Sequence, residues 1–149
     1  MNDGAIHIRS TTVIERSPAE VYAVWRDPRQ LTQGAGERVS VSGGSEDRYH
    51  WSVRAAGRTF EWDAKLVADE PARELRWQSL PGADVANSGA VHFAPRAAGQ
   101  ATEVSLTLSV QPPGGLVGVA AGKLLHPTLE RETAQLLERL KHRLEAASG

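Results

Sequence analysis

The chain has 149 residues, with 17 Lys and Arg against 18 Asp and Glu, and its formal net charge is −1. This balance argues against a nucleic-acid binder, which usually concentrates basic residues on one face. The chain has no cysteine, which excludes disulfides, thiolate metal sites and cysteine nucleophiles.

The start of the chain predicts a strand followed by a short helix. Apolar and β-branched residues alternate over Ile6–Ile14, which is the period of a strand. The segment Ser17-Pro18-Ala19-Glu20 then combines a Ser N-cap, Pro at the first helical position and Glu at the third. We expect a helix over residues 18–26, followed by a further helical turn at Pro28–Leu31.

The middle of the chain predicts strands joined by short turns. Between residues 60 and 66, apolar side chains alternate with charged ones, so the two faces of this strand differ clearly. The same period recurs in five other segments, at residues 39–41, 51–55, 75–79, 87–93 and 104–110. Short connections make consecutive strands antiparallel neighbours, which predicts a sheet of six or seven strands.

The last part of the chain predicts a long helix that starts at Leu116. Leu136, Leu140 and Leu144 recur at helical spacing and should pack against the sheet. Pro127 removes one backbone donor, so we expect it to kink or split this helix. The order of strand, short helix, further strands and long helix indicates an α+β fold. The length predicts one domain over residues 1–149.

Six sequence segments carry a resemblance to a known family. They are SPAEVY at 17–22, FEWDA at 60–64, LRWQSLPG at 75–82, NSGAVHF at 87–93, TEV at 102–104 and PPGG at 112–115. With the order of elements, they resemble the polyketide cyclase/dehydrase and lipid-transport family of the START-like, birch-pollen-allergen-like superfamily. The resemblance implies a helix-grip fold, in which a curved antiparallel sheet wraps around a long C-terminal helix. It also implies a pocket for a small hydrophobic molecule.

The strand phases suggest which side chains would form such a pocket. Trp51, Trp62 and Trp77 share the concave face, where they either stack on a flat ligand or fill the core. Ser79 and Asn87 flank the 80–86 loop, where they either bind a polar ligand group or satisfy the loop backbone. The candidate ligand-binding residues are Trp51, Phe60, Trp62, Trp77, Ser79, Asn87, Phe93, Leu106 and Leu108.

These features favour binding of a lipid, polyketide or isoprenoid-like molecule. One alternative is a cyclase- or dehydratase-type enzyme that holds a reactive polyketide-like chain folded. Another is a partner-binding module with a filled core. The pattern shows no inward pair of carboxylates for acid–base catalysis, and no histidine spacing typical of a metal site. We therefore assign no catalytic residue and expect no metal or cofactor.

The ends and the apolar runs of the chain bear on its location. The N-terminus lacks the basic start and apolar run of a secretion signal. The longest apolar stretch, residues 116–125, is about half the roughly 20 residues that a spanning helix needs. We expect a cytoplasmic monomer or homodimer with no membrane span and no nucleic-acid partner.

Overall fold

The computed structural model describes residues 6–32, 39–55, 57–111 and 115–146, without the side chains of residues 55, 58, 115–126 and 128. Within these ranges, three helices are present, α1 (Pro18–Arg26), α2 (Pro28–Leu31) and α3 (Gly115–Ala146). The strands are β1 (Ile6–Ile14), β2 (Val39–Gly43), β3 (Arg48–Ala55), β4 (Arg58–Glu70), β5 (Glu74–Ser79), β6 (Asn87–Arg96) and β7 (Ala101–Val110). Two short 3₁₀ turns are η2 (Ser45–Asp47) and η3 (Ala97–Gly99). The PPG turn at residues 112–114 lies outside the described residues.

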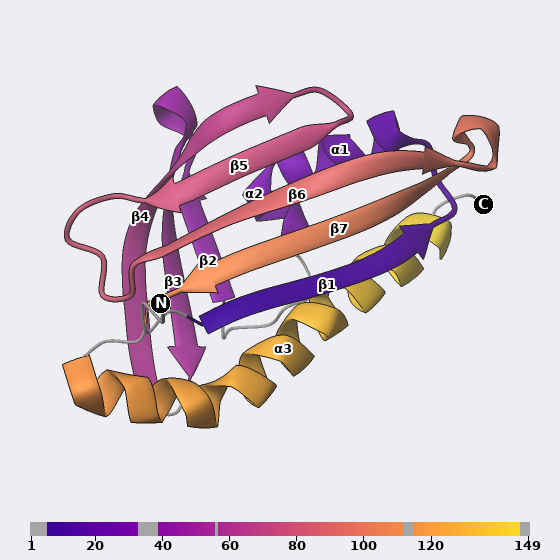
Figure 1. The fold of residues 1–149 in the computed structure, drawn as a ribbon. Coiled ribbons are helices and arrows are strands. Elements are labelled where there is room, and N and C mark those ends of the chain that lie inside the picture. The colour runs from indigo at the N-terminus through magenta and orange to yellow at the C-terminus, as the bar shows by residue number, and fades with distance from the viewer. Residues whose placement is uncertain (1–5, 33–38, 56, 112–114, 147–149) are drawn as a thin grey trace.

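The described strands form one antiparallel sheet of seven strands in the order β1-β7-β6-β5-β4-β3-β2. Strands that follow one another from β2 to β7 are neighbours, while β1 pairs with β7 at the other edge. Figure 1 shows α3 crossing below this edge, with α1 and α2 behind the sheet. The predicted α+β helix-grip fold is confirmed.

The long strand β4 connects two parts of the sheet. Residues 58–65 of β4 pair with β3, and residues 64–70 pair with β5. The register shifts between Leu66 and Ala68, where Val67 is an extra residue and is half exposed. A bulge of this kind bends a strand and increases its twist. In Figure 1, β2 and β3 accordingly run at a steep angle to β1 and β7, and the sheet curves around a concave face.

Helix α1 begins with the predicted capping box. The backbone N–H of Glu20 donates to the Ser17 hydroxyl at 3.3 Å, and the backbone N–H of Ser17 donates to Glu20 Oε1 at the same distance. The helix ends at Arg26, and Asp27 then caps α2 by accepting from the backbone N–H of Arg29. Both predicted helices are therefore confirmed with their bounds.

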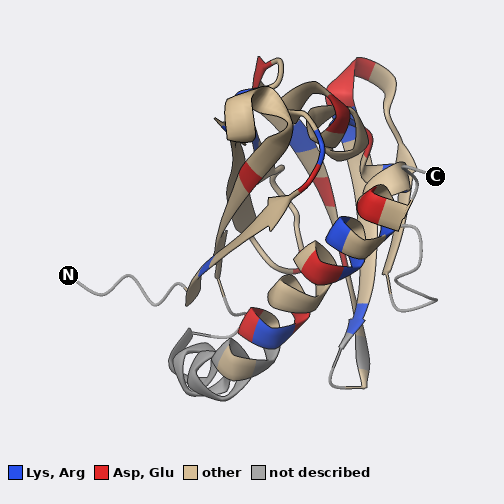
Figure 2. Cartoon of the chain, turned by 90° about the vertical axis from the view of Figure 1, so that its right-hand side faces the viewer, with Lys and Arg blue, Asp and Glu red and all other residues tan. Residues whose placement is uncertain are grey.

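The sequence predicted a kink or a split at Pro127, and the split does not occur, because α3 is one continuous helix that contains this proline. Its C-terminal part buries Leu137 and Leu140, which are 1% and 2% exposed, while Leu136 and Leu144 are partly buried. The predicted packing of this helix on the sheet is confirmed, although Leu137 is its most buried leucine. Figure 2 shows charged residues of both signs along the same helix.

Polar contacts fix the end of α3 to β1. Lys141 Nζ donates to the carbonyl oxygen of Val13 at 2.7 Å, and Arg16 Nε donates to that of Leu144 at 2.8 Å. Apolar residues of α1, β6 and β7, including Val21, Val91 and Val104, complete the core.

In the described part of the chain, no helix is both long and apolar enough to cross a bilayer.

The burial of Leu137 predicts that the packing of α3 contributes strongly to the stability of the fold. Leu137→Ala should lower the free energy of unfolding by about 2–5 kcal/mol, because it removes buried methyl groups and leaves a cavity. Leu144→Ala, at a partly buried position of the same helix, should lower the free energy of unfolding by clearly less. Urea denaturation followed by circular dichroism measures both values. Equal small losses would contradict the packing described for α3.

Candidate functional site

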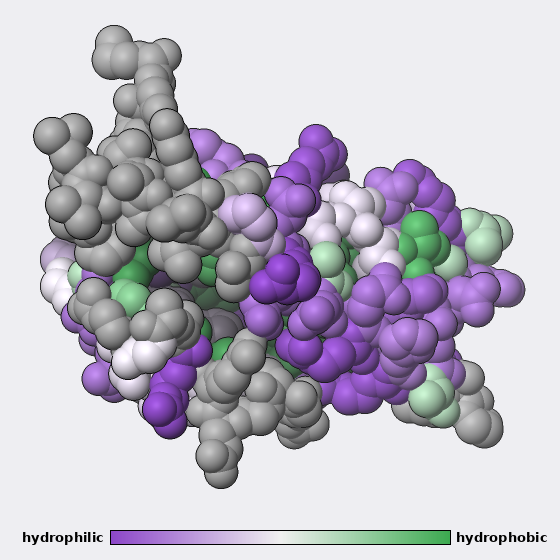
Figure 3. Space-filling model, turned by 90° about the horizontal axis from the view of Figure 1, so that it is seen from below, coloured by the Kyte–Doolittle hydropathy of each residue, from purple (hydrophilic) through white to green (hydrophobic). Residues whose placement is uncertain are grey.

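A pocket of about 390 Å³ lies between the concave face of the sheet and α3. We call it the inner pocket. Helices α1 and α2 contribute Trp25 and Leu31 to its wall, and α3 contributes Leu129 and Leu136. Seen from below, hydrophobic residues show at the bottom of a hollow in a largely hydrophilic surface (Figure 3). The volume falls within the range of about 300–1,000 Å³ that is typical of small-molecule sites.

All four tryptophans of the chain line the inner pocket. Trp51 and Trp62 are directly paired across β3 and β4, and their rings stack at 6.2 Å with an interplanar angle of 7°. Trp25 stacks on Trp77 at 6.5 Å and 23°. Flat aromatic walls of this kind favour planar ligands. The structure thus brings together the three predicted tryptophans and adds Trp25 of α1.

Most of the other predicted residues also reach this pocket. Phe60, Leu106, Leu108 and Asn87 are among its lining residues. Phe93 is not among the described lining residues. It is buried in the core, where its ring meets Tyr22 edge to face at 6.0 Å. The strand phase placed Phe93 on the correct face, but α1 covers that part of the sheet.

Ser79 bonds to the backbone of Asn87 across the 80–86 loop, and Asn87 bonds to the loop itself, in line with the loop role that the sequence left open. The Ser79 hydroxyl accepts from the backbone N–H of Asn87 at 2.9 Å, and Asn87 Nδ2 donates to the carbonyl oxygen of Val85 at 2.9 Å. Ser79 is not among the described residues that line the pocket, whereas Asn87 is. Whether Asn87 also contacts a ligand stays a prediction.

Several polar residues of the pocket were not predicted. Arg26, Tyr49, Glu132, Thr133 and Arg139 line it. Tyr49 precedes Trp51 by two residues in β3, so the phase that placed Trp51 inward could have identified it. The helical residues carried no such signal, because their facing depends on how α1 and α3 dock.

Arg26 is the centre of a hydrogen-bonded cluster at one side of the pocket. Its Nη2 lies 2.7 Å from Asp47 Oδ1, and its Nε lies 2.8 Å from Asp69 Oδ2. Its Nη1 lies 3.5 Å from the hydroxyl oxygen of Tyr49, and Tyr22 donates to Asp69 Oδ1 at 2.6 Å. The hydrogen bonds to Asp47 and Asp69 raise the pKa of the Arg26 guanidinium, so this group stays charged. The cluster links α1 to η2 and β4.

His50 has the phase opposite to Trp51 in β3 and lies on the outer face of the sheet. His50 lies between Glu61 Oε1 and Asp63 Oδ1, each 3.0 Å from a ring nitrogen. These two carboxylates, Glu61 foremost, raise the pKa of His50. Among the described residues, no group of three or more His, Cys, Asp or Glu side chains is arranged to hold a metal ion.

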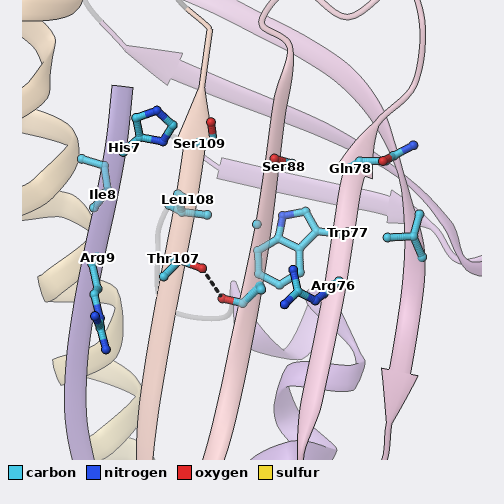
Figure 4. Close-up of a pocket in the computed structure, with 13 residues that line it drawn as sticks. His7, Ile8, Arg9, Arg76, Trp77, Gln78, Ser88, Thr107, Leu108 and Ser109 are labelled. Carbon is cyan, nitrogen blue, oxygen red and sulfur yellow. Dashed lines mark hydrogen bonds between the residues drawn. The ribbon is translucent and has the colours of Figure 1, made fainter. Parts of the chain in front are cut away.

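A second, more open concavity lies on the outer face of the sheet, and we call it the outer hollow. Polar side chains of four strands surround it, including Arg9, Arg76, Ser88 and Ser109 (Figure 4). Within it, the Thr107 hydroxyl donates to the carbonyl oxygen of Ala90 at 3.4 Å. Arg76 forms an ion pair with Glu74. Its lining mixes polar side chains with apolar ones such as Ile8, Val67 and Leu108, whereas the inner pocket has aromatic walls.

Gly89 separates the two concavities. It pairs with Trp77 on one side and with Leu108 on the other. A Cβ atom at Gly89 would lie 2.5 Å from Trp77 Cζ2 and 2.8 Å from Leu108 Cδ2. The indole of Trp77 therefore occupies the space that a side chain at position 89 would need. This packs the tryptophan over the backbone of β6.

Gly89→Ala should consequently displace Trp77. We expect a loss of about 1–3 kcal/mol in the free energy of unfolding, because the added methyl group overpacks this row of side chains, and a change in tryptophan emission. Ser88→Ala, one residue away on the exposed outer face, should stay within about 0.5 kcal/mol of the unmodified protein. Denaturant titration followed by fluorescence measures both effects. An unaltered Gly89→Ala protein would show that Trp77 is not held in this position.

The comparisons with known proteins agree with this fold. The family model described as polyketide cyclase/dehydrase and lipid transport matches residues 5–145. The search among curated proteins gives no significant match.

Solved structures similar to the chain span nearly all of it. DR_A0006 from Deinococcus radiodurans is 32% identical, with a TM-score of 0.63, and the match covers 87% of this chain and 97% of that one. TTHA0849 from Thermus thermophilus is 25% identical, with a TM-score of 0.78 and coverages of 96% and 99%. The Zhui aromatase/cyclase from Streptomyces sp. R1128 is 21% identical, with a TM-score of 0.72 and coverages of 97% and 99%, which shows the shared fold. The chain belongs to the polyketide cyclase/dehydrase and lipid-transport family.

Proposed function

We propose that the protein binds a small, flat, hydrophobic molecule in the inner pocket. The observation that carries this proposal is the position of the four tryptophans, which all line one pocket of about 390 Å³. Burying apolar ligand surface contributes roughly 25 cal/mol per Å², and stacking on indole rings adds to this. A polyketide or an isoprenoid with fused rings has the shape that two pairs of stacked indoles favour.

The pocket differs from an ordinary core in the exposure of its large side chains. Trp62 and Trp77 are only partly buried, whereas Leu75 and Leu106 on the same sheet face are almost fully buried. Exposing large aromatic surface to water is unfavourable. A ligand that covers the indoles would remove this cost. This supports binding over a module with a filled core.

The enzyme alternative stays a prediction. A structure with this fold is named an aromatase/cyclase, at 21% identity. A cyclase would need ionisable groups against its substrate, and Arg26 and Tyr49 are groups of the inner pocket that could serve. The cytoplasmic location, the monomeric or homodimeric state and the absence of a nucleic-acid partner also stay predictions.

A cavity-filling substitution tests the proposal. Ala64 is buried in β4 and lines the inner pocket. Ala64→Leu should weaken binding of the flat fluorophore 1-aminoanthracene by about tenfold or more, because the new side chain occupies ligand space. The melting temperature should stay equal or rise, since apolar space is filled. Fluorescence titration and thermal unfolding measure the two quantities.

The matched control is Ala94→Leu. Ala94 has the outward phase of β6 and is not among the described lining residues. This variant should bind 1-aminoanthracene as the unmodified protein does. If both variants bind equally well, or if the unmodified protein does not bind at saturating fluorophore, the inner pocket is not the ligand site.

A further inference from the structure

The hydroxyl group of Tyr49 is positioned within the inner pocket by its strand. Tyr49 pairs with Ala64 across β3 and β4, and Trp51 pairs with Trp62 two residues further along. Side chains two residues apart point the same way in a strand. Tyr49 therefore lies on the concave face beside the stacked tryptophans, and it lines the pocket with them.

Arg26 holds the oxygen atom of this hydroxyl. The guanidinium donates to it from Nη1 at 3.5 Å while its other nitrogens donate to Asp47 and Asp69 at 2.7 and 2.8 Å. Asp47 belongs to η2, whose backbone is in the left-handed region with a φ of 60°. The guanidinium is thus held by two carboxylates through Nε and Nη2, and it faces Tyr49 with Nη1.

The proton of the Tyr49 hydroxyl is available for a further hydrogen bond. A phenol donates one hydrogen bond and also accepts, and no described residue accepts from Tyr49. The other tyrosine of the chain differs, because the Tyr22 hydroxyl donates to Asp69 at 2.6 Å. A second donor in the same wall also has no partner among the described residues, namely the buried Nε1 of Trp25. The Tyr49 hydroxyl is therefore a donor of this wall that a ligand acceptor can satisfy.

The charges of the cluster select the kind of acceptor. Asp47 and Asp69 already pair with the single guanidinium of Arg26, so the charge of this group is compensated. A carboxylate ligand next to Tyr49 would find no unpaired charge on Arg26 and would lose water on entering an aromatic pocket, which is costly. A neutral carbonyl oxygen accepts the same hydrogen bond without that cost.

We propose that Tyr49 donates a hydrogen bond to a neutral carbonyl oxygen of the ligand, as in a ketone or quinone, and that Arg26 positions the Tyr49 hydroxyl for it. This inference rests on the proposed function and adds the chemical class of the ligand. Tyr49 is then the residue that distinguishes a ring system bearing a carbonyl group from a hydrocarbon of the same shape.

Three compounds of nearly the same shape test the inference: fluorene, 9-fluorenone and fluorene-9-carboxylate. Their affinities are measured by displacement of 1-aminoanthracene. Tyr49→Phe should weaken the binding of 9-fluorenone by about 3- to 10-fold, the effect of one ordinary hydrogen bond, and leave fluorene unchanged. Arg26→Lys cannot contact Asp47, Asp69 and Tyr49 together, and it should reduce the preference for 9-fluorenone in the same direction.

Thr107→Val is the matched control, because it removes a hydroxyl that lies in the outer hollow and is not among the described residues of the inner pocket. It should leave both affinities unchanged. If Tyr49→Phe binds 9-fluorenone as the unmodified protein does, or if the carboxylate binds most tightly through Tyr49, the inference is overturned. If fluorene itself fails to displace the fluorophore from the unmodified protein, the proposed function fails instead.

Discussion

Leu137 and Leu140 of α3 are buried against apolar residues of α1, β6 and β7, and Lys141 bonds to β1 close by. A single helix can cover only part of a seven-stranded concave face, and this contact decides which part it covers. Leu129 and Leu136 of the same helix line the inner pocket, and Leu136 also packs against the core. The core and the pocket are thus two consequences of one docking geometry. A change that shifts α3 along its axis alters both.

Strand register then determines which side chains line the pocket. Trp51 faces Trp62 because β3 and β4 pair at those positions, and Trp77 lies over Gly89 because β5 and β6 do the same. Gly89 has no side chain, so the indole of Trp77 has room beside it. The result is an aromatic wall, and polar groups of α1, β3, β6 and α3 lie beside it. Such a wall binds by shape, and its hydrogen bonds select among molecules of that shape.

The sequence predicted the parts of this arrangement that depend on local pattern. The capping box fixed the start of α1 through Ser17, and period two placed Trp51, Trp62 and Trp77 on one face. What it could not predict depends on contacts between distant segments. The alternation at residues 60–66 gives no sign of the extra residue at Val67, and nothing local shows that α1 covers Phe93 while Arg26 reaches Asp47 and Asp69.

The most direct test of the ligand site uses the indole N–H groups as reporters inside the protein. The four tryptophans give four indole signals in a ¹H–¹⁵N NMR spectrum, and all four residues line the inner pocket. Adding fluorene to saturation should shift the indole signals of Trp51, Trp62 and Trp77 while the backbone signals of outer-face residues such as Ser88 and Ser109 stay in place. If the four indole signals do not move, or if the shifts concentrate around the outer hollow, the inner pocket does not bind a flat apolar molecule.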